Sequence, residues 1–335
     1  MIPASQQITP EMDALLRRAG SNDINIAQAA QREVATAMTT PLKSGVLDGD
    51  IASGIFTDQT FLPGQEVSYP EDFVTPGSEK SLVAYTIPNH GAQAQRHFEG
   101  GEIRVSTFDV GAVADTNIKY VRDGRWDIMG KLMQVIEAMF IRRKNLDAWH
   151  LLLAAGTARN LVPYDDFATA GLFTKRLVAQ METIMRRSAG GNSTSTNRGR
   201  LTDLFMSPEA RQDVLSWDLT QIPDAMRQSI FMNWSAGGIA KIGDVTLHDL
   251  DELGVGQEFN DYFDTVLGGT FPTDKTECVV GLDLRNRDSF ANPIRAEVEV
   301  FEDASLHKQR RVGFYAWREH GFSVLDNRRT LIGAL

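Results

Sequence analysis

The longest helical pattern of the chain runs from Asp123 to about Ala155. Large apolar residues recur there at alternating steps of three and four, which places them on one face of a helix. These residues are Trp126, Met129, Met133, Ile136 and Phe140. The charged residues that follow fall mostly on the other side; they are Arg142, Arg143, Lys144 and Asp147. We expect a helix about 45 Å long, at about 1.5 Å per residue, packed along a sheet or along neighbouring subunits.

Residues at both ends of this pattern suit the termini of a helix. Asp123 can accept hydrogen bonds from the first turn, and Gly156 can adopt the left-handed conformation that often ends a helix. The pattern has too many charges, and too few consecutive apolar residues, to span a bilayer. We therefore expect a soluble protein without membrane contact.

The first 50 residues have a weaker pattern. Met12, Leu15 and Leu16 form one short apolar face, and residues 24–38 are polar and alanine-rich with few large apolar side chains. Such a segment buries too little apolar surface by itself to offset the conformational entropy lost on ordering. We expect it to be either disordered or ordered against other chains.

Between Phe61 and Ile103, glycine and proline residues separate short β-like pieces. The alternation of Val83, Tyr85 and Ile87 favours a strand with one covered face. Prolines at positions 70, 76 and 88 argue against a central place in a sheet. An excursion of about forty residues with so little core of its own indicates function, disorder or contact with a partner.

The rest of the chain alternates between strand and helix patterns. The predicted elements are a strand or short helix at 103–120, a helix at 173–189, a flexible loop at 190–199, a hairpin at 239–250, a buried strand at 278–284 and closing strands at 295–301, 309–317 and 322–325. Another helix is predicted to begin at Ser207, because Pro208 and Glu209 suit a first helical turn. Residues 157–288 thus form an α/β unit.

The chain is acidic. It has 44 Asp and Glu residues against 34 Lys and Arg, a formal net charge of −10, so its surface as a whole repels nucleic acid. Proteins that read DNA sequence usually carry the opposite sign. Two arginine pairs, Arg310–Arg311 and Arg328–Arg329, could contact phosphate. Pairing with carboxylates of a neighbouring subunit, or a solvated face, is the favoured interpretation.

The cysteine content and the N-terminal residues narrow the class of protein further. Cys278 is the single cysteine, which excludes an intramolecular disulfide and a multi-cysteine zinc site. Because it lies in an apolar run, we expect a small buried side chain and no nucleophile. The first residues lack the basic and apolar regions of a secretion signal, so the sequence predicts a cytoplasmic product.

No set of residues has catalytic or metal-binding spacing. The stretch from Gly124 to Leu132 is similar to a phosphate-binding loop, but it has five residues between its glycines where four are needed. Asp147 and His150 lie three residues apart on the long helix, with Glu137 earlier, but no second pair completes a metal cluster. We expect surface polar residues or a subunit-contact histidine. The sequence thus predicts no catalytic residue, no cofactor, no metal site and no enzyme activity.

The order of these segments resembles the major capsid proteins of tailed bacteriophages, which have the HK97 fold. The residues from Ala296 to Ala334, AEVEVFEDASLHKQRRVGFYAWREHGFSVLDNRRTLIGA, carry the resemblance best. They are similar to the family's closing strands: a charged strand, an arginine-flanked strand leading into Gly321 and Phe322, and a final apolar β piece.

The resemblance implies an α+β, HK97-like capsid fold in five parts. They are an N-terminal arm at 1–55, an extended β-hairpin loop at 56–106, a peripheral domain with the long helix as its spine at 107–156, an axial α/β domain at 157–288 and closing strands of the peripheral domain at 289–335.

The function implied by the resemblance is structural. The protein would self-assemble as hexamers and pentamers into an icosahedral shell that encloses double-stranded DNA. It would be located in the virion capsid, which is assembled in the host cytoplasm. Its partners would be other copies of itself, a separate scaffolding protein, a portal, a possible decoration protein and, by nonspecific proximity, the packaged DNA. Two alternatives stay open: an encapsulin-type protein compartment and, from a different class, an enzyme with an α/β catalytic domain.

One departure from the family concerns crosslinking. Members that crosslink their shells use a lysine of the extended loop with an asparagine and a glutamate of the closing strands. Lys80 could supply the lysine, but the corresponding closing stretch reads Arg310–Arg311 and Trp317–Arg318. We therefore expect no isopeptide bond and a shell held by noncovalent contacts. Because no long coiled coil precedes the arm, we expect any scaffold to be a separate protein.

Overall fold

The computed structural model describes residues 10–21, 23–48, 51–62, 64–70, 102–123, 126–188, 199–217, 240–268, 271–272, 275–285 and 287–335. The chain divides into two compact units. The first unit takes residues 1–67, 105–148 and 292–322, and the second takes residues 68–104, 149–291 and 323–335. Each unit has its own sheet and its own apolar core.

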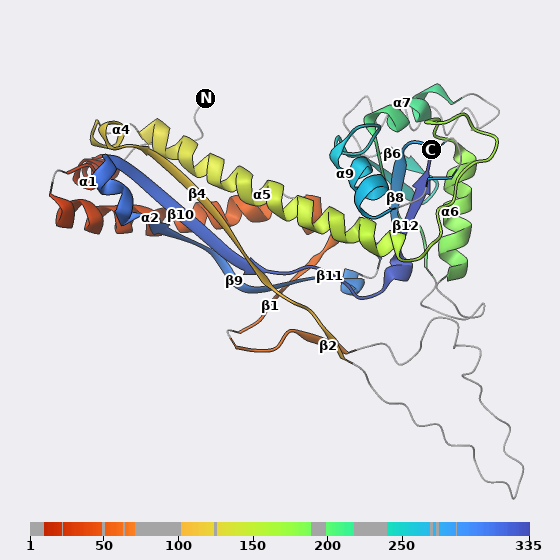
Figure 1. The fold of residues 1–335 in the computed structure, drawn as a ribbon, viewed down its shortest axis with the longest axis horizontal. Coiled ribbons are helices and arrows are strands. Elements are labelled where there is room, and N and C mark those ends of the chain that lie inside the picture. The colour runs from red at the N-terminus through yellow and green to blue at the C-terminus, as the bar shows by residue number, and fades with distance from the viewer. Residues whose placement is uncertain are drawn as a thin grey trace, which may run out of the picture. The chain divides into compact units, whose positions relative to one another are not determined.

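A long sheet is the framework of the first unit (Figure 1). Its strand order is β1 (Thr57–Thr60), β9 (Phe290–Glu302), β10 (Arg311–His320) and β4 (Phe108–Asn117). β10 pairs antiparallel with both β9 and β4. Side chains of β10 alternate, so Val312, Phe314 and Ala316 are buried while Tyr315 is exposed. The closing strands predicted at 295–301 and 309–317 are confirmed.

Helices pack on the buried face of this sheet. They are α1 (Pro10–Ala19), α2 (Ile24–Asp48), α4 (Ile118–Arg122) and the first part of α5 (Trp126–Thr157). α5 confirms the predicted long helix and its apolar face, since Ile136 and Phe140 are buried in the core. Lys144 is also buried, at 1% exposure. It follows Phe140 by four residues and therefore shares its face, which corrects the prediction that Lys144 lies on the polar side.

The N-terminal helices are ordered within their own chain. Leu16 of α1 and Val34 and Met38 of α2 are buried in the core that α5 and the sheet share. The Gln31 side-chain amide donates to the carbonyl oxygen of Ala19 across 2.9 Å and links the two helices. The expectation that this segment needs other chains for its burial is therefore wrong for α1 and α2. Alanine is a strong helix former and allows close packing, so few large apolar residues suffice.

The second unit is built on a mixed sheet. Its order is β12 (Thr330–Ala334), β8 (Cys278–Leu282), β5 (Asp203–Met206), β7 (Val245–Asp249) and β6 (Ala240–Ile242). β6 and β7 form the predicted hairpin, with Gly243 in the left-handed region at φ 64°. All residues of β8 are buried, as predicted for the strand around Cys278. β5 runs parallel to β7 and antiparallel to β8.

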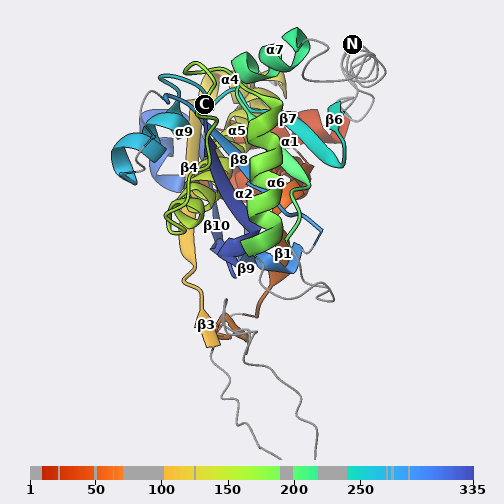
Figure 2. The ribbon, with the colours of Figure 1, turned by 90° about the vertical axis from the view of Figure 1, so that its right-hand side faces the viewer.

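Helices lie on both faces of this second sheet (Figures 1 and 2). Met181 of α6 (Lys175–Ser188) shares a core with Met206 of β5. The adjacent strand residue, Phe205, contacts Trp149 at the end of α5, and Trp149 contacts Phe259 of α9 (Glu258–Asp261). Because successive residues of a strand point to opposite faces, α6 and α9 lie on opposite sides of the sheet.

The remaining elements are α3 (Ile51–Ile55), α7 (Pro208–Ser216), β11 (Ser323–Val324) and the short helices η3 (Tyr262–Val266), η4 (Arg287–Ser289), η5 (Ala304–Gln309) and η6 (Asn327–Arg329).

Both predicted ends of the long helix differ from the structure. Asp123 is the C-cap residue of α4, and α5 begins at Trp126. Gly156 lies inside α5, where an added Cβ would come within 2.6 Å of the Ile332 side chain. The glycine therefore allows β12 to approach the helix. α7 begins as predicted, with the Ser207 hydroxyl accepting a hydrogen bond from the backbone N–H of Ala210.

The predicted excursion leaves and returns through a short antiparallel pair. β2 (Ser68–Pro70) pairs with β3 (Glu102–Arg104), and Pro70 lies opposite Glu102. Residues 71–101 are outside the described residues, and with them the strand expected around Tyr85 and the candidate Lys80. The loop expected at 190–199 is also outside, apart from Gly199. No described helix is both long enough and apolar enough to cross a membrane. The five-part domain division stays a prediction.

Candidate functional site

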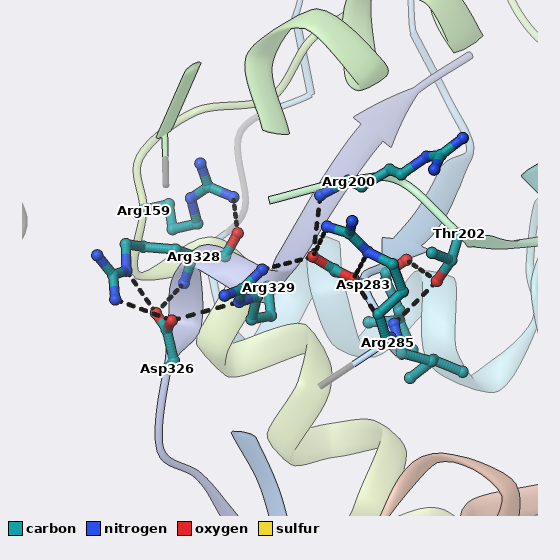
Figure 3. A network of polar contacts seen from close by, with 10 residues as sticks. Arg159, Arg200, Thr202, Asp283, Arg285, Asp326, Arg328 and Arg329 are labelled. Carbon is teal, nitrogen blue, oxygen red and sulfur yellow. Dashed lines mark hydrogen bonds and ion pairs between the residues drawn. The ribbon is translucent and has the colours of Figure 1, made fainter. Parts of the chain in front are cut away.

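A network of arginines and aspartates joins distant segments of the second unit (Figure 3). Its first centre is the carboxylate of Asp283, which is fully buried. Arg329 donates to Asp283 Oδ2 from Nη1 across 2.5 Å, and Arg285 binds the same carboxylate through Nε and Nη2, both at 3.1 Å. The backbone N–H of Arg200 donates at 2.9 Å. These donors satisfy a charge that would otherwise be costly to bury.

The second centre is Asp326. Arg328 binds its two carboxylate oxygens at 2.7 and 3.0 Å, and Arg329 Nε lies 3.5 Å from Oδ2. Arg159, just beyond α5, donates to the carbonyl oxygen of Thr330 at 2.7 Å. Arg329 thus bridges both carboxylates (Figure 3), and the network fastens the last strand to β8 and to the end of α5.

Burial and charge act in opposite directions on Asp283. Burial alone would raise its pKa, but hydrogen bonds from Arg285 and from the Arg200 backbone, with the charges of Arg329 and Arg285, outweigh it. The pKa of Asp283 therefore lies below its ordinary value. Burial also lowers the pKa of Arg159, against the charge of Asp326. Asp283 is an ionised anchor, and its geometry serves architecture rather than chemistry.

The network corrects one interpretation of the arginine pairs. Arg329 is 5% exposed at its side chain and binds carboxylates of its own chain, so it neither pairs with another subunit nor lies on a solvated face. Arg311 also pairs within the chain, with Asp115 at 2.5 Å. Arg310 has a positive φ of 56°. This is the left-handed backbone conformation, which residues other than glycine rarely adopt.

A carboxylate cluster lies at the start of α7. Ser207 donates to Glu277 Oε2 at 3.0 Å, and the Phe173 backbone N–H donates to Asp213 Oδ2 at 2.9 Å. Burial raises the pKa of Glu277, and the charges of Glu209 and Asp213 raise it further, against the Ser207 hydrogen bond. Burial also raises the pKa of Asp213. In the part of the chain that the structure describes, no group of three or more His, Cys, Asp or Glu could hold a metal ion.

A buried histidine lies in the core of the first unit. His320 is 1% exposed, and its ring lies 5.1 Å from Phe108 and 5.3 Å from Phe322, centre to centre. Burial, with the charges of Arg318, Lys144 and Arg143, lowers its pKa to about 3. His320 is therefore neutral at physiological pH and acts as an aromatic core residue. Nothing in its scattered position along the sequence predicted this burial.

The other candidate residues of the sequence do not come together. His150 stacks on Tyr262 with ring centroids 3.6 Å apart, and Asp147 forms an exposed ion pair with Arg143. Lys131 lies inside α5, so the phosphate-loop interpretation stays rejected. Cys278 is buried, as predicted, and burial raises its thiol pKa to about 12.

An apolar row crosses the sheet of the first unit on the face opposite its core. Val113 of β4 lies opposite Tyr315 of β10, which lies opposite Phe301 of β9. The rings of Tyr315 and Phe301 stack 5.4 Å apart. Val113 is 58% and Tyr315 40% exposed. Three adjacent large apolar side chains on one exposed rung form a surface suited to a protein partner.

Comparison with known proteins shows the fold of this chain. No family model matches the sequence, and no curated protein matches it. Among solved structures, the chain is similar to the capsid asymmetric unit of Cyanophage Pam1, with TM-score 0.56, 14% identity and coverage of 84% of this chain and 88% of that chain. It is similar to a chain from Microbacterium phage Oxtober96, with TM-score 0.56, 11% identity and coverage of 85% and 90%.

A third similar structure is the capsid of a native GTA particle, with TM-score 0.54, 12% identity and coverage of 87% of this chain and 90% of that chain. The likenesses therefore extend over most of the chain on both sides of the comparison. The chain has the α+β, HK97-type capsid fold, which confirms the fold that its sequence predicted.

Proposed function

We propose that this protein is a phage major capsid protein that associates with copies of itself to form a shell. One observation carries the proposal: the whole-chain likeness to solved capsid chains, at TM-scores of 0.54 and 0.56 over 84–87% of the chain. A sequence identity of 12–14% supports a shared fold but not, by itself, a shared function. The assignment of function therefore also needs a surface that fits self-association.

The apolar row formed by Val113, Tyr315 and Phe301 supplies such a surface. Its strands are long, and the register shifts between β10 and β9 begin only after Trp317, so the row is held rigidly and loses little entropy when it is covered. Acidic and basic residues border it, including the ion pair of Asp115 and Arg311. An apolar centre with a polar rim is the usual composition of a protein interface.

The proposal also includes the form of the shell and what it encloses. Copies assemble as hexamers and pentamers into an icosahedral shell around double-stranded DNA, with many weak contacts adding up through multivalency. A net charge of −10 suits a container that does not grip packed DNA tightly. A separate scaffolding protein, a portal and a possible decoration protein would complete the particle, which forms in the host cytoplasm and becomes the virion capsid. The shell needs no cofactor, metal, catalytic residue or isopeptide bond.

Negative-stain electron microscopy of the purified protein tests this proposal. We expect closed particles of uniform size, and Tyr315→Asp should prevent them because a charge in the apolar row cannot be desolvated cheaply. Tyr315→Phe is the matched control and should assemble like the unmodified protein. Circular dichroism of all three proteins checks that the exposed substitution leaves the fold intact.

Monomers of the unmodified protein at all concentrations and salt conditions would contradict the shell. Particles that form equally well from Tyr315→Asp would exclude the apolar row as a contact while leaving assembly itself in place. If the particles purified from cells enclose protein cargo and no nucleic acid, that result would point to a protein compartment instead of a virion capsid.

A further inference from the structure

An open groove of about 540 Å³ lies along α6 in the second unit. Leu161, Pro163 and Tyr164 line it from one side, and Ile184 of α6 lines it from the other. Tyr164 forms a parallel β-bridge with Ala334 at the end of β12. The groove therefore lies at the β12 edge of the second sheet.

A loop between β7 and α9 projects an apolar side chain from another part of the same unit. Val255 is 62% exposed and lies between Gly254 at φ 123° and Gly256 at φ 72°. Both conformations favour glycine, and together they turn the chain sharply on either side of Val255. The base of the loop is fixed, because Leu253 is fully buried and the Phe259 N–H donates to the Glu252 carbonyl at 3.1 Å. A single exposed valine is normal on a protein surface. Whether Val255 marks a contact therefore depends on the charge of the residues around it.

The two surfaces carry opposite charge. The segment from Asp249 to Val266 contains six carboxylates and no Lys or Arg. α6 contains four basic residues and one acidic residue, Glu182. The basic residues are Lys175, Arg176, Arg186 and Arg187, all exposed. Arg176 lines the groove itself and lies 3.7 Å from Asp165, and the exposed Asp166 lies close to the groove residue Tyr164 in the sequence. Basic residues still outnumber acidic ones along α6, so an acidic loop with an apolar tip matches the α6 side of this apolar groove.

Their places in the fold prevent the two surfaces from meeting within one copy. The groove lies at the β12 edge, whereas the Val255 loop follows β7, next to the opposite edge strand β6. The loop is held beside the residues that follow the central strand β5, since a Cβ on Gly254 would lie 3.4 Å from side-chain atoms of Ser207 and Glu209. Two different complementary surfaces fixed at separate places of one unit can meet only between copies. Such a head-to-tail contact closes into a ring when the rotation between copies allows it.

We propose that the Val255 loop of one copy docks into the α6 groove of the next copy around a ring. The inference rests on the proposed function and specifies the contact through which neighbouring copies associate. The valine tip fills the apolar part of the groove, and carboxylates such as Glu252 face the basic residues of α6. Since opposite charges draw the surfaces together, the contact weakens as salt concentration rises.

Disulfide trapping between copies tests the contact directly. Cys278 is buried and its thiol pKa is raised to about 12, so introduced cysteines react selectively. Full-length Val255→Cys protein is mixed with Ala179→Cys protein, whose substituted residue lines the groove, with diamide as the oxidant. We expect a crosslinked dimer on non-reducing gels, and a ladder from the protein that carries both substitutions. Val266→Cys, an exposed valine in the same acidic segment, is the matched control and should crosslink to Ala179→Cys at least about tenfold less.

An assembly measurement completes the test. Val255→Asp should raise the critical concentration for assembly at least about tenfold, because it puts a carboxylate into an apolar groove. Val266→Asp should leave the critical concentration unchanged. Shells that form normally from Val255→Asp, with no Val255–Ala179 crosslink, would overturn the inference and leave the proposed function in place. A crosslinked ladder without closed shells would support the inference and count against the proposed function.

Discussion

Arg329 and Asp283 form an ion pair out of solvent: Nη1 lies 2.5 Å from Oδ2, and the two side chains are 5% and 0% exposed. Arg285 binds the same carboxylate but is 45% exposed at its side chain. The two arginines on this carboxylate thus differ in burial, and Arg329 also reaches Asp326. This difference makes them a matched pair for measuring what the buried contact contributes.

We expect Arg329→Met to lower the free energy of unfolding by about 3–5 kcal/mol, because it leaves a buried carboxylate short of a partner. Arg285→Met should cost less, about 1–3 kcal/mol, because it removes two hydrogen bonds from the same buried carboxylate but leaves its buried partner Arg329 in place. Urea denaturation followed by circular dichroism measures both. Equal losses would show that burial does not decide the strength of this network.

The pH dependence of stability should have opposite signs at two carboxylates. The pKa of Asp283 is lowered in the folded protein, so its contribution is present above the ordinary Asp pKa and is lost as pH falls through the folded value. The pKa of Glu277 is raised, so its ionisation costs stability above the folded value, and this cost disappears below the ordinary Glu pKa.

Glu277→Gln should therefore raise the melting temperature at pH 7.5, and this gain should shrink towards zero near pH 4. The glutamine side-chain oxygen can still accept the hydrogen bond from Ser207, so the substitution removes the charge alone. Calorimetry across this pH range measures the effect. A gain that stays constant with pH would show that the pKa of Glu277 does not differ between the folded and the unfolded protein.

Two glycines in the first unit should respond oppositely to alanine. A Cβ on Gly20 would lie 2.7 Å from the Arg122 Cα, a backbone atom that cannot move aside, so Gly20→Ala should destabilise by about 1–3 kcal/mol. A Cβ on Gly130 meets nothing within 4 Å. Because Gly130 lies inside α5, Gly130→Ala should stabilise by about 0.5–1 kcal/mol. Thermal denaturation compares the two, and a loss at Gly130 would contradict the open space found there.

The excursion between β2 and β3 can be removed at a defined point. Pro70 and Glu102 are paired, so a short Gly-Asn turn can replace residues 71–101 and close the hairpin. If the extended loop serves contacts between copies, as the sequence predicts, we expect the shortened protein to fold and stay soluble but no longer to assemble. Size-exclusion chromatography and electron microscopy check this, and normal shells from the shortened protein would contradict the assignment of these residues to assembly.

Periodic patterns along the sequence determined the local elements. The steps between Ile136 and Phe140 predicted the buried face of α5, and the turn at Gly243 predicted the β6–β7 hairpin, because each depends on residues a few positions apart. The fold was predicted by a resemblance: the order of the elements, and the residues from Ala296 to Ala334, resemble phage major capsid proteins of the HK97 fold. The absence of catalytic spacing led to an expectation of no enzyme activity, which stays a prediction.

Only the tertiary structure decided which distant residues meet. The pair of Asp283 and Arg329 is separated by 46 positions, and the row of Val113, Tyr315 and Phe301 comes from three strands. Local patterns also misjudged the N-terminal helices, because α1 and α2 gain their burial from α5 and the sheet rather than from their own few large residues. Burial, and pairing between residues far apart in the sequence, depend on how the elements pack, because each partner is supplied by a different part of the chain.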